Sequence, residues 1–130
     1  MKNKISLFVL SVFFCLPAFS QITLPADGNK KASVSEDIGI TRVTMNYSRP
    51  GVKGREGKIW GELVHYGFAD LHYGTSKAAP WRAGANENTT MEVSTDVTLE
   101  GKPLKAGKYG FFIAMGEDSA TVILSNFSTA

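Results

Sequence analysis

The sequence contains almost no cysteine, no excess of charge and no long hydrophobic run. Its single cysteine, Cys15, lies near the N-terminus, so the rest of the chain can form neither a disulfide nor a cysteine metal site. Removal of an N-terminal segment that includes Lys2 and Lys4 leaves 12 of the 14 basic residues, against 12 acidic ones. A chain so balanced lacks the field that attracts nucleic acids or anionic membranes, and we expect neither as a partner.

The longest apolar run, residues 5–16, carries no charge but is only twelve residues long, too short to span a bilayer. A basic N-terminus precedes it, and Ala18 and Ser20 follow at the positions that small residues take before a signal-peptidase cut. We therefore predict a signal peptide over residues 1–20 and export to the periplasm or the extracellular space. No small residue stands directly before Cys15, so we do not expect a lipoprotein.

The rest of the chain has the pattern of a small all-β domain. Residues 21–30 have no periodicity and are expected to form a flexible leader, and residues 31–130 a single β-rich domain. From residue 89 onward, turn signals recur about every ten residues without a helical period, which predicts an antiparallel β-sandwich, Ig-like or jelly-roll-like. The strands are expected at residues 42–48, 90–94, 97–99, 109–115 and 120–125, with a long irregular loop before the central motif.

That central motif is the stretch 80–90, which sets an indole, a guanidinium, two amides and a carboxylate around small residues. One interpretation is a ligand site in which Trp81 stacks on a ring while Arg82, Asn86 and Glu87 supply hydrogen bonds. The other is a structural lock in which Arg82 bonds carbonyls and Glu87, because an unpaired buried guanidinium is too costly for a small domain. In the first case, side chains of the preceding loop form the remaining walls; we expect these to be His72 and Tyr73.

Metal and anion sites have weaker support. His65 and His72 are seven residues apart, which matches neither a helical pair nor a short strand pair, so we expect no metal and no cofactor. The glycine-rich basic stretch 51–58 could form an anion nest, but it lacks the phosphate-loop pattern, and a solvated loop is the favoured interpretation.

An enzyme is the alternative hypothesis. Glu87 could act as a general acid or base beside a second carboxylate, in a hydrolase acting on a small polar or sugar-like substrate. The candidates for that second carboxylate are Asp70, Glu62 and Glu92. No serine lies in a nucleophile elbow and no cysteine survives maturation, so a non-catalytic module is favoured.

Several motifs together resemble a known family. They are Tyr47-Ser48-Arg49-Pro50, Lys58-Ile59-Trp60-Gly61, Tyr66-Gly67, the stretch 79–89, the stretch 97–104 and Ala106-Gly107-Lys108-Tyr109-Gly110. Over roughly residues 30–128 the chain is similar to the secreted bacterial domain-of-unknown-function family 2911, found mostly in Bacteroidota. The resemblance implies an exported β-rich domain and no established activity. The family pattern usually continues with a Trp-Gly-Ser-Phe-like strand, and since a complete sandwich would also need a seventh strand, we expect a domain truncated at its C-terminus.

Taken together, these patterns predict an exported binding or structural module of the cell envelope. Its partner would be a small polar ligand or an envelope protein.

Overall fold

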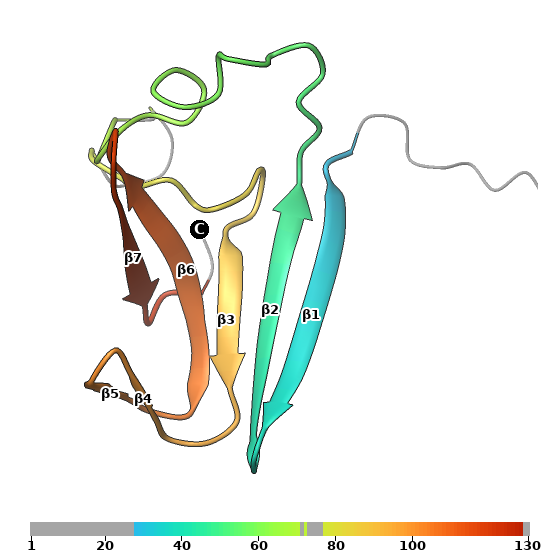
Figure 1. Ribbon diagram of the computed structural model, residues 1–130, viewed down its shortest axis with the longest axis vertical. Helices are drawn as coiled ribbons and strands as arrows, with labels where there is room; N and C mark the ends of the chain where they lie inside the picture. The colour runs from blue at the N-terminus through green and yellow to red at the C-terminus, as the bar shows by residue number, and fades with distance from the viewer. Residues whose placement is uncertain (1–27, 71, 73–76, 129–130) are drawn as a thin grey trace, which may run out of the picture.

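The computed structural model describes residues 28–70, 72 and 77–128, and within them every regular element is a β-strand (Figure 1). The predicted signal peptide and most of the predicted leader lie outside the described residues. Seven strands are present, and their bounds are β1 Lys30–Ile38, β2 Thr41–Arg49, β3 Thr89–Val93, β4 Val97–Leu99, β5 Lys102–Leu104, β6 Gly107–Met115 and β7 Ala120–Ser125. The prediction of an all-β fold is confirmed.

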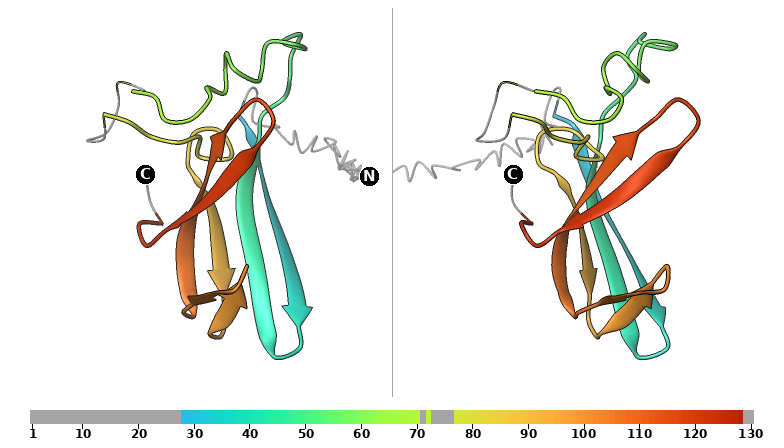
Figure 2. Two further views of the ribbon diagram at one scale, coloured as in Figure 1. Left: turned by 60° about the vertical axis from the view of Figure 1, so that its left-hand side comes forward. Right: turned by 90° about the vertical axis from the view of Figure 1, so that its left-hand side faces the viewer.

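The strands form two antiparallel sheets in a sandwich-like arrangement. The larger sheet has the order β1-β2-β3-β6-β7, and β4 and β5 form a separate two-stranded sheet (Figure 1). Chain neighbours therefore lie side by side, apart from two excursions. The β4–β5 hairpin interrupts the path from β3 to β6, and residues 50–88 separate β2 from β3. The described part of this long segment lies mostly beyond one end of the sheet (Figure 2).

Turn chemistry explains two of the hairpins. β1 and β2 pair from Lys30 opposite Arg49 to Ile38 opposite Thr41, which leaves a two-residue turn. Its first residue, Gly39, has φ +62°, a conformation that costs glycine nothing. In the sequence, the flanking isoleucines make this stretch look like a break in alternation and hide the turn. In the β4–β5 turn, Glu100 and Gly101 both have positive φ, as a type I′ hairpin turn requires.

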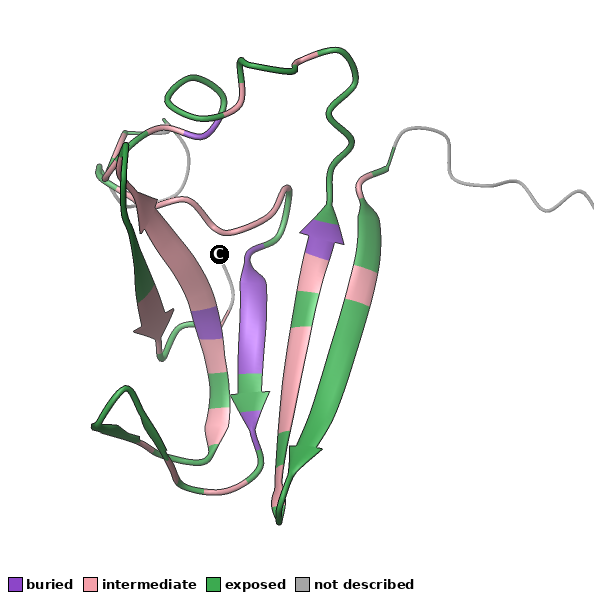
Figure 3. Ribbon diagram, viewed as in Figure 1, coloured by how far each residue is buried: buried purple, intermediate pink, exposed green. Residues whose placement is uncertain are grey.

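The buried apolar side chains gather on the central strand β3 (Figure 3). Met91 and Val93 are buried there, and Val93 is only 1% exposed; Val64 from the long loop is the third buried apolar residue in the described part of the chain. Residues 111–113 of β6 are apolar without alternation, a pattern that predicts a strand covered on both faces. β6 does lie between β3 and β7, but these three residues are only half-buried. The β4–β5 sheet lies near the start of β6 rather than along the strand (Figure 1).

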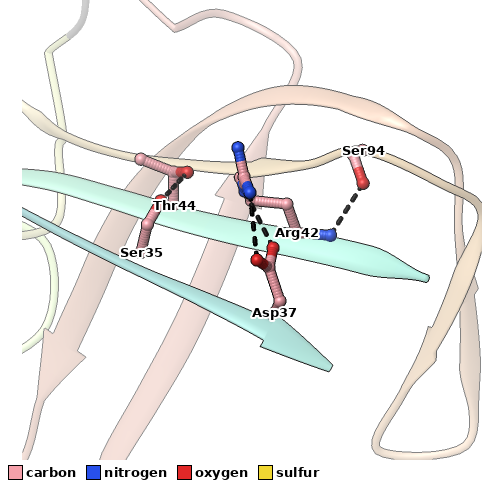
Figure 4. Close-up of polar contacts among 5 residues, drawn as sticks. All are labelled: Ser35, Asp37, Arg42, Thr44 and Ser94. Carbon is pink, nitrogen blue, oxygen red and sulfur yellow. Dashed lines mark hydrogen bonds and ion pairs between the residues drawn. The ribbon is translucent and has the colours of Figure 1, made fainter. Parts of the chain in front are cut away.

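Polar contacts of Arg42 join the turn end of the β1–β2 hairpin together and to the end of β3 (Figure 4). Arg42 lies directly opposite Asp37 and binds both of its carboxylate oxygens, at 2.8 and 2.9 Å. The backbone N–H of Arg42 donates to Ser94 Oγ at 2.7 Å, just after β3 ends. The hydrogen bonds from Arg42 hold the pKa of Asp37 below its ordinary value.

Among the described glycines, Gly110 leaves the least room for a side chain. A Cβ built there would lie 2.3 Å from the carbonyl oxygen of Phe127 and 2.8 Å from the Phe112 ring. The chain after β7 therefore crosses β6 at a position where only glycine fits.

We expect Gly110→Ala to destabilise the domain by about 1–3 kcal/mol, because the added methyl group must push a backbone segment away. Urea unfolding measures the change. Gly28→Ala is the matched control, since its methyl group would meet nothing within 4 Å. Equal stability of the two variants would contradict the close approach.

The Asp37–Arg42 pair predicts a pH dependence with a definite sign. A carboxyl whose folded pKa is lowered adds stability above its ordinary pKa of 3.8, and this contribution is lost as the pH falls through the folded pKa. Asp37→Asn should therefore melt below the parent protein near neutral pH. The difference should close in acid. Thermal melts across the acid range measure this, and a constant difference would refute it.

Candidate functional site

Two segments of the chain pair, one after the other, with the same edge of β6; we call the line of residues along this edge the row beside β6. β3 occupies it as far as Thr89, opposite Phe111. Trp81 then takes up the same row opposite Ile113, with N–H to carbonyl bonds of 3.1 and 2.8 Å in the two directions. Residues 82–88 therefore leave the sheet as a compact turn and return to it, which places the central motif at the sheet end.

Side-chain and backbone bonds close this turn. Thr89 N–H donates to the Arg82 carbonyl at 3.0 Å, and Thr89 Oγ1 donates to the Ala83 carbonyl at 3.0 Å. The Trp81 indole N–H donates to the Gly84 carbonyl at 3.2 Å, and the Arg82 guanidinium donates to the Asn86 carbonyl. The lock interpretation is thus partly observed, because Arg82 bonds a carbonyl of its own turn.

A pocket of about 730 Å³ opens between this turn and the loop that follows β2. Its walls combine the end of β2, the long loop and the turn itself. The described lining residues are Asn29, Ser48, Pro50, Gly51, Val52, Arg55, Ile59, Trp60, Leu63, Val64, His65, Trp81, Arg82, Ala83, Gly84, Ala85 and Asn86. Most of these side chains are apolar, and the size suits a small organic ligand.

Two indoles face each other across chain segments that are distant in sequence. The rings of Trp60 and Trp81 meet edge to face, with centroids 5.6 Å apart and an interplanar angle of 81°. Both line the pocket, and they are the chain's only tryptophans. Trp60 is 54% exposed, so much of its ring remains open to contact.

The polar part of the lining is cationic. Arg55 and Arg82 both contribute to it, and no Asp or Glu is among the described lining residues. Arg55 is held in place by its own loop, where Nε donates to the Val52 carbonyl at 2.9 Å and Nη2 to the Gly51 carbonyl at 2.7 Å. A guanidinium has five N–H donors, so several remain for other acceptors.

His65 also lines the pocket and is unusual in its bonding. Both ring nitrogens are shielded from solvent, and neither has a hydrogen-bond partner in the described structure. Buried polar atoms normally have such a partner, so the pocket wall contains an unsatisfied imidazole.

Trp81, Arg82 and Asn86, three of the sequence-based candidates, are brought together in this pocket, with His65. Glu87 is not among its described lining. It is exposed and binds Lys31 Nζ of β1 at 2.9 Å, an interaction that lowers the pKa of Glu87. The expected Arg82–Glu87 bond is therefore replaced by a pair between Glu87 and β1, in a second, polar hollow.

The other candidates lie apart from the pocket. The His72 side chain is almost fully exposed and sits 3.5 Å from Asp70, and it is not in the described lining. Tyr73 lies outside the described residues. The described chain brings no three His, Cys, Asp or Glu side chains together as a metal site. Neither hollow has two carboxylates in its described lining.

Sequence reasoning missed Trp60 and Arg55. The stretch that contains Arg55 was interpreted as a solvated loop, and the apolar residues after it were left without a role. The available signal was the pair of apolar dipeptides Ile59-Trp60 and Leu63-Val64, which a purely solvated loop would not need.

Comparison with known proteins places the chain in a family. A family model described as "Protein of unknown function (DUF2911)" matches residues 29–130. Searches of curated proteins and of solved structures gave no match. Within the described residues, no helix is long and apolar enough to cross a membrane.

The turn at residues 82–88 predicts a difference between two adjacent buried threonines. Thr89→Val removes the donor to the Ala83 carbonyl and should cost about 1–3 kcal/mol, because that carbonyl loses its partner. Thr90→Val is the control, since Thr90 is also buried but its hydroxyl makes no hydrogen bond within the described structure. Chemical unfolding followed by tryptophan fluorescence measures both. Equal losses would show that the turn does not depend on the Thr89 hydroxyl.

Proposed function

Because the chain belongs to the DUF2911 family, whose function is unknown, we propose from its own geometry that it is a non-catalytic binding module. Its ligand is a small molecule with a flat apolar ring or face, held in the pocket between Trp60 and Trp81. The edge-to-face indole pair in an open pocket is the observation that carries this proposal. Indoles in an open apolar pocket offer large contact areas to such a ring.

The arrangement of the pocket supports binding rather than a purely structural role. A tryptophan that served only to fill the core would be covered, whereas Trp60 is more than half exposed beside an apolar pocket. Trp81 is fixed by backbone bonds to Ile113 and by its indole bond to Gly84. One wall is thus rigid, which lowers the entropy cost of ordering the site on binding.

No observation favours the hydrolase. Acid–base hydrolysis of a glycosidic bond needs two carboxylates flanking the substrate. The pocket has none in its described lining, and Glu87 is engaged with Lys31 elsewhere. The binding module is accordingly the function we propose.

The place of action follows from the N-terminal pattern. The basic start, the apolar run and the small residues before residue 21 support export, so we propose that binding takes place in the periplasm or outside the cell. A module there would hold a ligand or present it to another envelope component.

Intrinsic fluorescence tests the proposal, because the only two tryptophans both line the pocket. We expect the uncharged aromatic probe 2-naphthamide to change this signal saturably, with calorimetry giving the affinity. Trp60→Ala should weaken binding by about 2 kcal/mol, the usual effect of removing a central aromatic contact. The exposed Trp60 contributes little to folding, so the variant should remain folded.

Phe68→Ala is the matched control. Phe68 is similarly exposed but is not in the described lining of the pocket. Its removal should leave the affinity for 2-naphthamide unchanged. Absence of saturable binding to the parent protein, or equal losses in the two variants, would refute the binding function at this site.

A further inference from the structure

We infer that the ligand of this pocket carries a carboxylate on its apolar ring, and that Arg55 and Arg82 recognise it. The inference rests on the proposed binding function and goes beyond it by naming the chemical class of the ligand. It starts from a contrast between the chain and the pocket. The charges balance once the predicted signal peptide is removed, yet the described lining has two arginines and no acid.

This local imbalance favours an anion for an electrostatic reason. In a concave site with apolar walls, charges of one sign reinforce each other, because the low-dielectric walls focus the field. A carboxylate entering such a site gains from both cations and meets no acidic side chain of the described lining. A neutral ligand of the same shape gains only the apolar contacts.

Arg55 is already oriented for this role. Its bonds to the Gly51 and Val52 carbonyls use two of its donors and fix the guanidinium plane before any ligand arrives. The remaining donors form part of a rigid fork, the geometry that binds a carboxylate through two parallel hydrogen bonds. Because the loop already orders this side chain, less conformational entropy is lost when a ligand binds it.

Arg82 lines the same pocket from a different segment of the chain, the turn at residues 82–88. It directly follows Trp81, at the start of the turn that leaves the sheet. Its carbonyl accepts a hydrogen bond from Thr89 N–H, and its guanidinium donates to the Asn86 carbonyl. The turn thus fixes both the backbone and the side chain of this residue. Two cations from separate chain segments then line a single apolar pocket with two indoles.

His65 adds an observation that is independent of the arginines. Its ring nitrogens are shielded and unpartnered within the described structure, although they belong to a residue of the pocket wall. No group of the described structure bonds this imidazole, so an acceptor oxygen that displaces the atoms shielding its N–H gains a hydrogen bond without breaking an existing one. Three nitrogen-bearing side chains and two indoles therefore point to an aromatic acid as the ligand class.

The test compares 2-naphthoate with 2-naphthamide, which have the same ring system and nearly the same shape but differ in charge. Calorimetric titrations of the full chain should show naphthoate binding about 10- to 100-fold more tightly, the range expected for hydrogen bonds to a charged group. Arg55→Gln and Arg82→Gln should each reduce this preference about tenfold or more, and neither should much change the affinity for naphthamide.

Arg49→Gln is the control for overall charge. Arg49 stands between the lining residues Ser48 and Pro50 in the chain but is itself not in the described lining, so its loss changes the net charge equally. The naphthoate preference should survive this substitution. Arg55→Gln keeps the test decisive should Arg82→Gln disturb its turn, and unfolding curves of all three variants identify any that misfold.

The two proposals fail in different ways. If naphthamide binds saturably but naphthoate binds no more tightly, the pocket is a binding site and the carboxylate inference is wrong. A preference that persists in both pocket variants, or that falls equally in Arg49→Gln, also overturns the role of Arg55 and Arg82. If neither probe binds, the proposed function itself fails.

Discussion

The row of backbone bonds beside β6 is the constraint on which the rest of this structure depends. β3 fills the row up to Thr89, and Trp81 resumes it opposite Ile113, so the intervening residues have to leave the sheet and return to one line. Backbone donors and acceptors beside a strand need partners, and the bond from Thr89 to the Arg82 carbonyl supplies one at the point of return. The turn that holds Trp81 and Arg82 is therefore as well anchored as the sheet.

The pocket exists because a long loop meets this anchored turn at the sheet end. Backbone hydrogen bonds tie the loop to the sheet, for example from Gly67 N–H to the Met115 carbonyl at the end of β6. The loop then brings Trp60 and Arg55 to a wall that already holds Trp81. A site built this way combines a fixed side with a side whose sequence can vary, which is how loops on rigid scaffolds generally carry binding functions.

The net charge of the chain does not predict the charge of its pocket. The acid nearest to Arg82 in the central motif, Glu87, pairs with Lys31 of β1 in a different hollow. That pairing separates the carboxylate from the arginines and leaves the aromatic pocket with cations in its described lining. A chain with balanced charge can therefore present a strongly one-signed field at one place.

The all-β class and most of the strands were determined by the sequence alone, because alternation and turn residues act over a few positions. Residues 97–99 and 120–125 were predicted with the bounds that β4 and β7 have. β1 and β5 were not among the predicted strands, and the Gly39 turn between β1 and β2 was obscured by its isoleucine neighbours. The site was half predictable, since Trp81, Arg82 and Asn86 stand together in one motif. The tertiary structure alone decided that Trp60 and Arg55 join them and that Glu87 turns to Lys31. These contacts link residues distant in the chain, and no local pattern encodes which distant segments the topology of a sheet brings together.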